Sequence, residues 1–485
     1  MNARVSKSRY ERLLPKLRNE LLDAQARLRE DGSFALALIL TGVPAAGRSE
    51  TVNELLEWLD PKHISVHALR APDREDRQRP PLWRYWRTLP ARGRMAFYFG
   101  GWYSEYLALA LHSPGKARRL SERLFERIRS LETMLAADGV RVVKLHLHTD
   151  AKTQRKRLAR LSADQLTRWR TTREDRWLAR HYKQVARASA RVVKATDQAA
   201  APWHVIDGTD EEHRLLTVGR VLRDELRKTL RQASAKKKAR SPRRSSNRRA
   251  SLSLTAPATA QTDEEYEIAL AKLQGRLASL TRRTRFGRHA LVLAFEGLDA
   301  AGQGGAIRRI THALDARQYQ VIPVVAPTAE ESSYPYLWRF WRYVPELGSI
   351  TIYDRSWYGR VLVERVRGLT PEADWRRAFA EIREFELELT EHGVAVAKFW
   401  LDVSKEEQLE RFRAREADSL RRFKVDKEDW ANRRYYDAYR SAAAEMIKRT
   451  DAESARWTLI AADDKKMARL AVLKTVCEAV ERALD

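Results

Sequence analysis

Cysteine is almost absent from this chain. Cys477 is the single cysteine among 485 residues, which excludes an intrachain disulfide and is typical of a reducing compartment. The sequence also lacks an uninterrupted apolar stretch of about 18 residues, the length that a membrane-spanning helix needs. Its first residues contain no apolar run after their charges, as a secretory signal would. We therefore expect a cytoplasmic protein without a membrane partner.

Acidic residues are scarce relative to basic ones. The chain has 65 Asp and Glu against 92 Lys and Arg, which gives a formal charge of +27 and a pI near 10.2. Such a surplus of positive charge favours binding of polyanions, although the composition does not identify which. The length suits two or three domains, each able to bury a core of its own.

One set of motifs occurs twice. The first copy consists of Gly-Val-Pro-Ala-Ala-Gly-Arg-Ser from Gly42, Leu-Trp-Arg-Tyr-Trp-Arg from Leu82 and Phe-Tyr-Phe-Gly-Gly-Trp-Tyr from Phe97. The second consists of Gly-Leu-Asp-Ala-Ala-Gly-Gln-Gly from Gly297, Leu-Trp-Arg-Phe-Trp-Arg from Leu337 and Ile-Tyr-Asp-Arg-Ser-Trp-Tyr from Ile352. The offset of about 255 residues is too long for a solenoid repeat and indicates a duplicated domain.

A basic, apolar-poor segment separates the two copies. Residues 234–262 combine dense positive charge with proline, serine and alanine, which predicts a disordered linker between domains 1–233 and 263–485. A solvated tether and a polyanion-binding arm both remain open for it. Each half begins with an amphipathic helical pattern, at Arg9–Arg29 and Glu264–Arg283.

Apolar runs alternate with helical patterns in both halves. The expected strands are Ala35–Leu40, Ile64–Ala68, Met95–Phe99 and Val140–Leu147 in the first half, and Ala290–Phe295, Val321–Val325, Ile350–Tyr353 and Val394–Leu401 in the second. Continuously apolar strands alternating with helices predict an α/β fold in which helices cover both faces of a parallel sheet.

The strand ending at Phe295 runs into a glycine-rich loop and then into a helical pattern. Such a loop directs backbone N–H groups into one concavity, and the helix N-terminus adds positive partial charge, so the loop suits a phosphate. Its spacing is that of the P-loop, with glutamine where lysine is expected. The candidate phosphate-binding residues are Gly297, Gly302, Gln303, Gly304 and Gly305. A turn that only joins a strand to a helix is the alternative.

Two carboxylates accompany this loop. Asp354 ends an apolar strand, where P-loop enzymes hold Mg²⁺, and Asp299 lies inside the loop itself. Carboxylate and phosphate oxygens are the ligands that Mg²⁺ prefers, so both residues are candidate metal ligands. A helix cap or turn role is the alternative for a lone aspartate at a strand end.

The segment between these elements is rich in aromatic residues and arginine. Leu337, Phe340 and Trp341 form an apolar stripe that we expect in the core rather than stacked on bases. Arg339 and Arg342 share another face, where they suit phosphate oxygens or surface ion pairs. A later run of basic residues suggests an anion track and includes Arg411, Arg413, Arg415, Arg421, Arg422 and Lys424.

The second half resembles the family-2 polyphosphate kinases, in particular their two-domain polyphosphate:AMP phosphotransferases. The resemblance is carried by Phe-Glu-Gly-Leu-Asp-Ala-Ala-Gly-Gln-Gly-Gly-Ala-Ile-Arg-Arg from Phe295, Pro-Tyr-Leu-Trp-Arg-Phe-Trp from Pro335 and Tyr-Asp-Arg-Ser-Trp-Tyr-Gly-Arg-Val-Leu-Val-Glu-Arg-Val from Tyr353. It implies two tandem P-loop kinase-like domains with a helical lid, and phosphoryl transfer between polyphosphate and a nucleotide with Mg²⁺.

The resemblance also implies roles for individual residues. Asp299 and Asp354 would align metal and acceptor, with Arg355 beside them as a third catalytic residue. Arg308, Arg309, Arg355 and Arg360 would hold phosphates, and Arg411–Lys427 would form a mobile lid. The departure is Gln303, which replaces the family's loop lysine and brings no charge to the transferring phosphate.

The first half lacks both carboxylates. Its loop has Pro44 where the second has Asp299, and Phe99 stands where the second strand ends in Asp354, so we expect poor Mg²⁺ binding and a structural or anion-guiding role.

Together with the motifs, this resemblance implies transfer of the terminal phosphate of inorganic polyphosphate to AMP, which yields ADP. The alternatives are ADP as the acceptor, ATP as the donor, or a non-catalytic polyanion-binding protein. We expect a homo-oligomer and no nucleic-acid partner.

Overall fold

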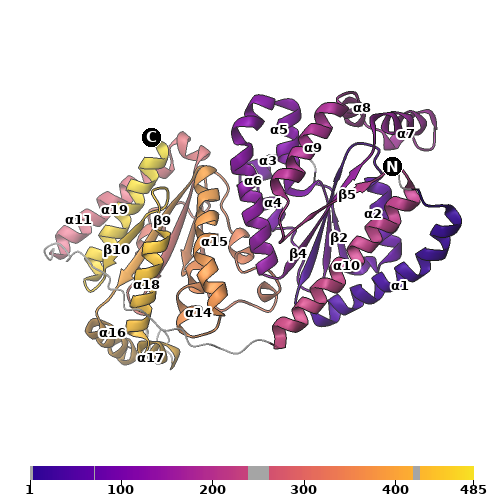
Figure 1. Cartoon of the computed structure of the whole chain (residues 1–485). Helices are drawn as coiled ribbons and strands as arrows, with labels where there is room; N and C mark the ends of the chain where they lie inside the picture. Colours follow the sequence, from indigo (N-terminus) through magenta and orange to yellow (C-terminus); the bar gives the residue numbers. More distant parts are fainter. Residues whose placement is uncertain (1–3, 70, 239–261, 419–426) are drawn as a thin grey trace. The chain divides into compact units, whose positions relative to one another are not determined.

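The computed structural model describes residues 4–69, 71–238, 262–418 and 427–485. The chain forms two compact units (Figure 1). The first comprises Met1–Pro72, Arg84–Arg240 and Pro327–Trp338, and the second comprises Asp73–Trp83, Ser241–Ala326 and Arg339–Asp485.

The first unit contains a five-stranded parallel sheet. Its strands are β1 (Ala35–Gly42), β2 (Ile64–His67), β3 (Met95–Phe99), β4 (Val140–His148) and β5 (Trp203–Asp207), in the order β2-β3-β1-β4-β5. Its longer helices are α1 (Lys7–Asp31), α2 (Arg48–Trp58), α5 (Ser104–His112), α6 (Pro114–Ala137), α7 (Ala151–Ala163), α8 (Arg173–Arg180), α9 (Tyr182–Thr196) and α10 (Glu211–Lys238). Helices α1, α2 and α10 cover one face of the sheet, and α5, α6 and α9 cover the other (Figure 1).

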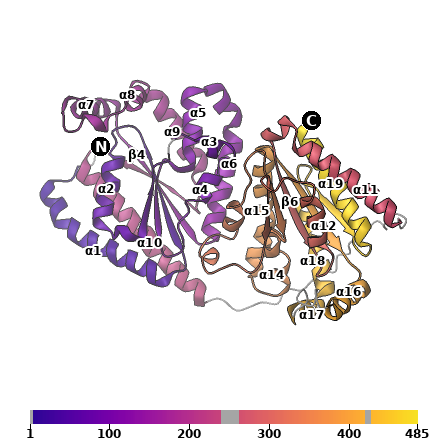
Figure 2. The ribbon, with the colours of Figure 1, turned by 180° about the vertical axis from the view of Figure 1, so that it is seen from behind.

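The second unit repeats this topology. Its strands are β6 (Ala290–Gly297), β7 (Tyr319–Pro323), β8 (Ile350–Asp354), β9 (Val394–Asp402) and β10 (Trp457–Ala461), in the order β10-β9-β6-β8-β7. Its longer helices are α11 (Asp263–Thr281), α12 (Gln303–Thr311), α15 (Glu372–Glu391), α16 (Lys405–Ala417), α17 (Lys427–Arg433), α18 (Tyr436–Thr450) and α19 (Lys465–Leu484), seen from behind in Figure 2. Strands β1 and β6 are the central strands of their sheets. Each glycine-rich loop directly follows one of them, so it lies at the carboxyl edge of the sheet, near its centre.

The predicted fold class is confirmed, and all eight predicted strands exist. Every residue of β6 is buried, which explains the apolar run Ala290–Phe295 that forms most of it. Sequence reasoning missed the edge strands β5 and β10 and placed β7 two residues too late. These edge strands are short and only partly buried, so they lack the continuous apolar pattern of a central strand.

The helix before the predicted linker extends further than its sequence indicated. Helix α10 ends at Lys238, so residues 234–238 are helical, and the next helix has its N-cap at Thr262. Residues 239–261, most of the predicted linker, lie outside the described residues. None of the helices in the described ranges is both long and apolar enough to cross a membrane.

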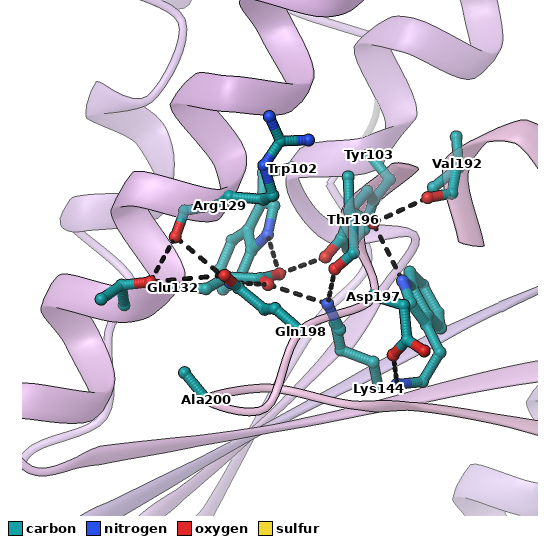
Figure 3. A network of polar contacts seen from close by, with 12 residues as sticks. Trp102, Tyr103, Arg129, Glu132, Lys144, Val192, Thr196, Asp197, Gln198 and Ala200 are labelled. Atoms are coloured by element: carbon teal, nitrogen blue, oxygen red, sulfur yellow. Dashed lines mark hydrogen bonds and ion pairs between the residues drawn. The ribbon is translucent and has the colours of Figure 1, made fainter. Parts of the chain in front are cut away.

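A buried polar network links the sheet of the first unit to α6 (Figure 3). The Lys144 ammonium on β4 donates to Glu132 on α6 at 2.8 Å and to the carbonyl of Thr196 at 2.7 Å. Trp102 donates its indole N–H to the same carboxylate at 3.0 Å, and the Tyr103 hydroxyl donates to it as well. Both charges are fully buried, so each satisfies the other.

The second unit contains the same network at the same offset. Lys398 donates to Glu386 at 2.8 Å and to the carbonyl of Thr450 at 2.7 Å. The indole of Trp357 donates to Glu386 at 3.1 Å, and the hydroxyl of Tyr358 donates at 2.6 Å. The duplication therefore extends to buried polar contacts, which the repeated sequence motifs alone did not reveal.

We expect Lys144→Met to lower the free energy of unfolding by about 3–5 kcal/mol, because Glu132 would be left as an unpaired buried charge. Chemical denaturation followed by tryptophan fluorescence measures this loss. The double variant Glu132→Leu with Lys144→Met, which removes both charges, should be less destabilised than the single variant. An unchanged unfolding midpoint for Lys144→Met would contradict the assigned role.

Candidate active site

The glycine-rich loop of the second unit joins β6 to α12. A Cβ at Gly297 would lie 2.4 Å from the carbonyl oxygen of Leu401, so only glycine fits beside that strand. Gly302 has a φ of 105°, in the left-handed region, and a Cβ there would meet no atom within 4 Å. The loop thus packs against the sheet at its start and faces open space where α12 begins.

Two side chains of helix α16 donate hydrogen bonds to the backbone of this loop. Gln408 donates to the backbone carbonyl of Asp299 at 3.0 Å, and Arg411 donates to that of Ala300 at 2.9 Å. Arg411 is buried and also binds the carbonyl of Ala462 at 2.7 Å. The sequence placed Arg411 in an anion track and at the start of a lid, but its guanidinium instead fixes the shape of the loop.

Asp299 and Arg355 meet at the mouth of the loop. The Arg355 guanidinium lies 2.5 Å from Oδ1 of Asp299, while the side-chain amide of Asn432 on α17 donates to Oδ2 at 3.1 Å. Arg355 has a φ of 62°, a left-handed conformation that is costly for a side chain with a Cβ. A strained residue held directly against a loop carboxylate indicates a functional site.

Asp354 ends β8, next to β6 in the sheet, where it pairs in register with Phe295. Burial raises the pKa of its carboxyl above the ordinary value, and the neighbouring Arg355 guanidinium opposes that rise. The described part of the chain provides no hydrogen bond or ion pair to the Asp354 side chain. Its oxygens are therefore available to a cation or a substrate.

Glu296 is a site residue that sequence reasoning missed. Its carboxylate is buried and accepts from the backbone N–H of Ser356 at 2.8 Å and from the Ser356 hydroxyl at 2.7 Å. Burial raises the pKa of Glu296 to about 7, although Arg355 and the Ser356 bonds lower it. By anchoring Ser356, Glu296 restrains the left-handed turn at Arg355. An acidic residue within a buried strand was the available sequence signal.

The other predicted phosphate-binding residues lie on several elements. Gly304, Gly305, Arg308 and Arg309 belong to α12, and Arg415 lies in the last turn of α16. Arg339 donates to the carbonyl of Val325 at 3.0 Å, and Arg360 pairs with Glu364 at 2.9 Å. Arg342 is exposed and lies beside the ring of Tyr343. Arg422 and Lys424 lie outside the described residues, as does most of the predicted lid beyond α16.

The aromatic stripe is core, as predicted. Leu337, Phe340 and Trp341 are all buried, and Trp341 packs edge-on against Phe385 at 5.0 Å. The segment forms only a short helix, α13 (Trp338–Trp341), preceded by a 3₁₀ turn.

Gln303 occupies the position of the missing loop lysine. Its side-chain nitrogen is buried and has no hydrogen-bond partner in the described structure. A buried donor without a partner costs free energy, so a ligand that offers an acceptor at this point would satisfy it.

The carboxylates fit a magnesium ion only in combination with substrate oxygens. No group of three or more His, Cys, Asp or Glu side chains suited to a metal occurs among the residues that the structure describes. Asp299 and Asp354 are the pair at the loop, and Mg²⁺ is commonly held by one or two carboxylates together with substrate phosphates and water. The donor set is therefore compatible with Mg²⁺.

The first unit keeps the loop backbone but not its chemistry. Gly42, Ala45 and Gly47 have φ values of 153°, 57° and 93°, close to the 159°, 63° and 105° of their counterparts at 297, 300 and 302. Gln154 and Arg157 on α7 bind the loop carbonyls of Pro44 and Ala45 at 2.9 and 3.0 Å, as Gln408 and Arg411 do in the second unit.

The side chains at this loop differ. Thr41 stands in place of Glu296, Gly100 in place of Arg355 and Gly101 in place of Ser356. The first unit therefore lacks the arginine, the serine that follows it and the glutamate that binds this serine. The guanidinium of Arg214 instead lies against Gly47, where the second unit is open.

A parallel β/α unit with a phosphate-type loop, a strand-end aspartate and a strained arginine defines a P-loop phosphotransferase fold. The polyphosphate kinase 2 family matches residues 4–234 and 260–485. The chain therefore belongs to the polyphosphate kinase 2 family, and both of its halves carry the family's domain.

Several relatives match nearly the whole chain. The polyphosphate:AMP phosphotransferase of Pseudomonas syringae pv. tomato is 44% identical over 98% of this chain and 96% of its own length. That of Pseudomonas aeruginosa is 42% identical over 99% and 97%, respectively. A crystal structure assigned to polyphosphate kinase 2 from Pseudomonas aeruginosa PA01 superimposes with a TM-score of 0.86 at 39% identity, over 99% of this chain and 97% of the other.

Proposed function

We propose that this protein transfers the terminal phosphate of inorganic polyphosphate to AMP, yielding ADP and a polyphosphate shortened by one unit. The observation that carries the proposal is the contact of Arg355 with Asp299 at the mouth of the glycine-rich loop, next to the strand-end Asp354. Relatives named polyphosphate:AMP phosphotransferase over nearly the whole chain support AMP as the acceptor.

In the proposed reaction an oxygen of the AMP phosphate attacks the terminal phosphorus of polyphosphate, and the bond to the bridging oxygen breaks. The departing chain retains that oxygen. Catalysis of this kind depends on alignment and on stabilisation of charge at the transferring group. The loop N–H groups and the N-terminus of α12 would bind phosphate oxygens, while Arg355 would neutralise charge there.

Asp299 and Asp354 would hold Mg²⁺, which supplies positive charge to the phosphate oxygens. Asp299 would also orient Arg355, since the two side chains are already in contact. Arg308, Arg309, Arg339, Arg342, Arg360, Arg415, Arg422 and Lys424 are proposed as further phosphate contacts.

We assign catalysis to residues 263–485 and a non-catalytic role to residues 1–233, because the first unit has Pro44 and Phe99 in place of the two carboxylates. A cytoplasmic location and a homo-oligomeric state complete the proposal. The cytoplasm supplies AMP and a reducing environment in which Cys477 remains a thiol.

The function is tested by incubating the protein with polyphosphate and AMP, ADP, GMP or GDP, with Mg²⁺ or with a chelator. Formation of ADP from AMP that stops on chelation is expected. Preferential formation of ATP from ADP would favour the alternative acceptor, since relatives named ADP-polyphosphate phosphotransferase match 42% of this chain. Absence of transfer to every acceptor would contradict the proposal.

Gln303→Lys is expected to preserve or raise the rate of transfer. The substitution would place an ammonium where a buried amide nitrogen now lacks a partner, and would add charge beside the transferring phosphate. Single-turnover rates with AMP and polyphosphate measure the effect. A Gln303→Met variant of similar length serves as the uncharged control. A loss of rate in the lysine variant alone would show that the loop requires the side-chain amide of Gln303.

A further inference from the structure

Most of the surplus of positive charge in the chain lies in its first half. Residues 1–238 contain 49 Lys and Arg against 28 Asp and Glu, whereas residues 262–485 contain 38 against 37. The surplus is therefore 21 charges in the first half and one in the second. The half that is proposed to carry out the chemistry is nearly neutral, although its substrates are anions.

Much of that surplus is concentrated in three consecutive helices, α7, α8 and α9. Residues 151–196 contain 14 basic and three acidic side chains, while the corresponding residues 405–450 of the second half contain 13 and 10. The basic residues are equally frequent in the two halves, so the difference arises from the loss of acidic ones. The segment of the first half therefore offers fewer carboxylates with which its basic side chains could form ion pairs.

These basic residues lie on the outer faces of their helices. On α9, Lys183, Arg187, Arg191 and Lys194 are exposed at spacings of four, four and three residues, and the opposite face buries Val185, Ala188 and Val192. The same spacing recurs on the other two helices. The exposed cations of the three helices, which we call the basic layer, are Lys152, Arg155, Lys156, Arg160, Arg173, Arg176, Arg180, Lys183, Arg187, Arg191 and Lys194.

Within the described residues, Arg191 is the member of the basic layer that contacts a carboxylate, that of Glu122 at 3.3 Å. Other side chains of α7 point toward the protein interior and have hydrogen-bond partners there. Gln154 and Arg157 turn inward and bind the loop carbonyls. The helix therefore attaches a cationic outer surface to the rigid loop of the first unit. Neighbouring helices of the layer contact one another in the order α7, α8, α9 (Figure 1).

We propose that the basic layer of α7, α8 and α9 is a binding surface for long-chain polyphosphate, separate from the catalytic loop. Rows of exposed cations one helical turn apart match a linear polyanion that carries charge on every repeat. The identity of the polyanion rests on the proposed function. The surface gives the duplicated half a use that requires no carboxylate and no metal.

Single-stranded nucleic acid fits this surface less well. Binding of its bases relies on aromatic side chains that stack on them. Trp177 in α8 stacks on His181 at 4.1 Å, and the Tyr182 hydroxyl in α9 donates to the carbonyl of Thr149 at 3.0 Å, so both are engaged in the fold. Trp169, between α7 and α8, is 73% exposed, but one ring does not form a run of stacking platforms. The basic layer offers contacts to phosphate alone.

The test compares two triple variants that remove equal charge from the first half. One, Lys183→Gln with Arg187→Gln and Lys194→Gln, alters the basic layer. The other, Lys7→Gln with Arg12→Gln and Lys16→Gln, alters exposed residues of α1. Fluorescence anisotropy with end-labelled long-chain polyphosphate in a chelator measures binding without turnover. Thermal unfolding confirms that both variants are folded.

The α9 variant is expected to bind long chains at least about tenfold more weakly at low salt, and its salt dependence should fall in slope by about two. Turnover of tripolyphosphate with AMP should remain unchanged, because the substitutions leave the residues of the catalytic loop in the second unit intact. The α1 variant should bind like the unmodified protein.

If both variants bound long-chain polyphosphate equally weakly, the overall charge of the first half would explain the binding, and the proposal would be overturned. Tighter binding by the unmodified protein of single-stranded RNA than of polyphosphate of matched charge would overturn the assignment of the ligand. Since binding is measured without AMP or Mg²⁺, a failure of the proposed catalytic function would appear only in the turnover assay.

Discussion

Asp354→Asn and, separately, Asp299→Asn are expected to lower turnover of AMP and polyphosphate by about a hundredfold or more, the scale of removing one electrostatic stabiliser from an active site. Asparagine keeps the shape of each side chain but removes its negative charge. Asp354 would lose its capacity to hold a cation beside the loop, and Asp299 would lose its ion pair with Arg355. Steady-state rates at saturating Mg²⁺ measure both effects.

Asp315→Asn provides a matched control, since Asp315 pairs with Arg317 and does not contact the loop. Its turnover should equal that of the unmodified protein. Circular dichroism and the thermal unfolding midpoint should show that all three variants are folded. If both site variants kept near-native turnover, Asp299 and Asp354 would not be catalytic and the site would have to be sought elsewhere.

Arg355→Ala is expected to reduce the single-turnover rate by roughly a hundredfold, whereas Arg48→Ala should change it only modestly. Arg355 contacts Asp299 directly and is held in a left-handed conformation by its surroundings. Arg48 begins α2 directly after the glycine-rich loop of the first unit, at the position of Gln303. In the segment after β3, Gly100 and Gly101 replace Arg355 and Ser356.

The two arginine variants act as controls for each other, because each removes one guanidinium, from the segment after β8 in Arg355→Ala and from the start of α2 in Arg48→Ala. The comparison requires both proteins to bind AMP and polyphosphate at saturating concentrations. If Arg48→Ala silenced the enzyme and Arg355→Ala spared it, catalysis would belong to the first half.

The two loops show that geometry and chemistry are separable in this protein. Their backbones share the same left-handed positions, and each is fixed by a glutamine and an arginine from the following helix. What differs is the set of side chains that face the loop. Both halves therefore retain the loop backbone and the side chains that fix it, whereas only the second half has the two carboxylates.

The sequence alone determined the duplicated α/β fold, the phosphate-type loops and the half in which both carboxylates occur. These features have local signals: a central strand is continuously apolar because both of its faces are buried, and a glycine-rich turn follows from its own residues. Tertiary structure decided the partners of Asp299, the anchoring of Ser356 by Glu296 and the inward turn of Arg411. These contacts join residues distant in sequence, so no local pattern encodes them. The same holds for the basic layer, since the sequence gives the number of its charges but only the fold shows which ones lack a carboxylate partner.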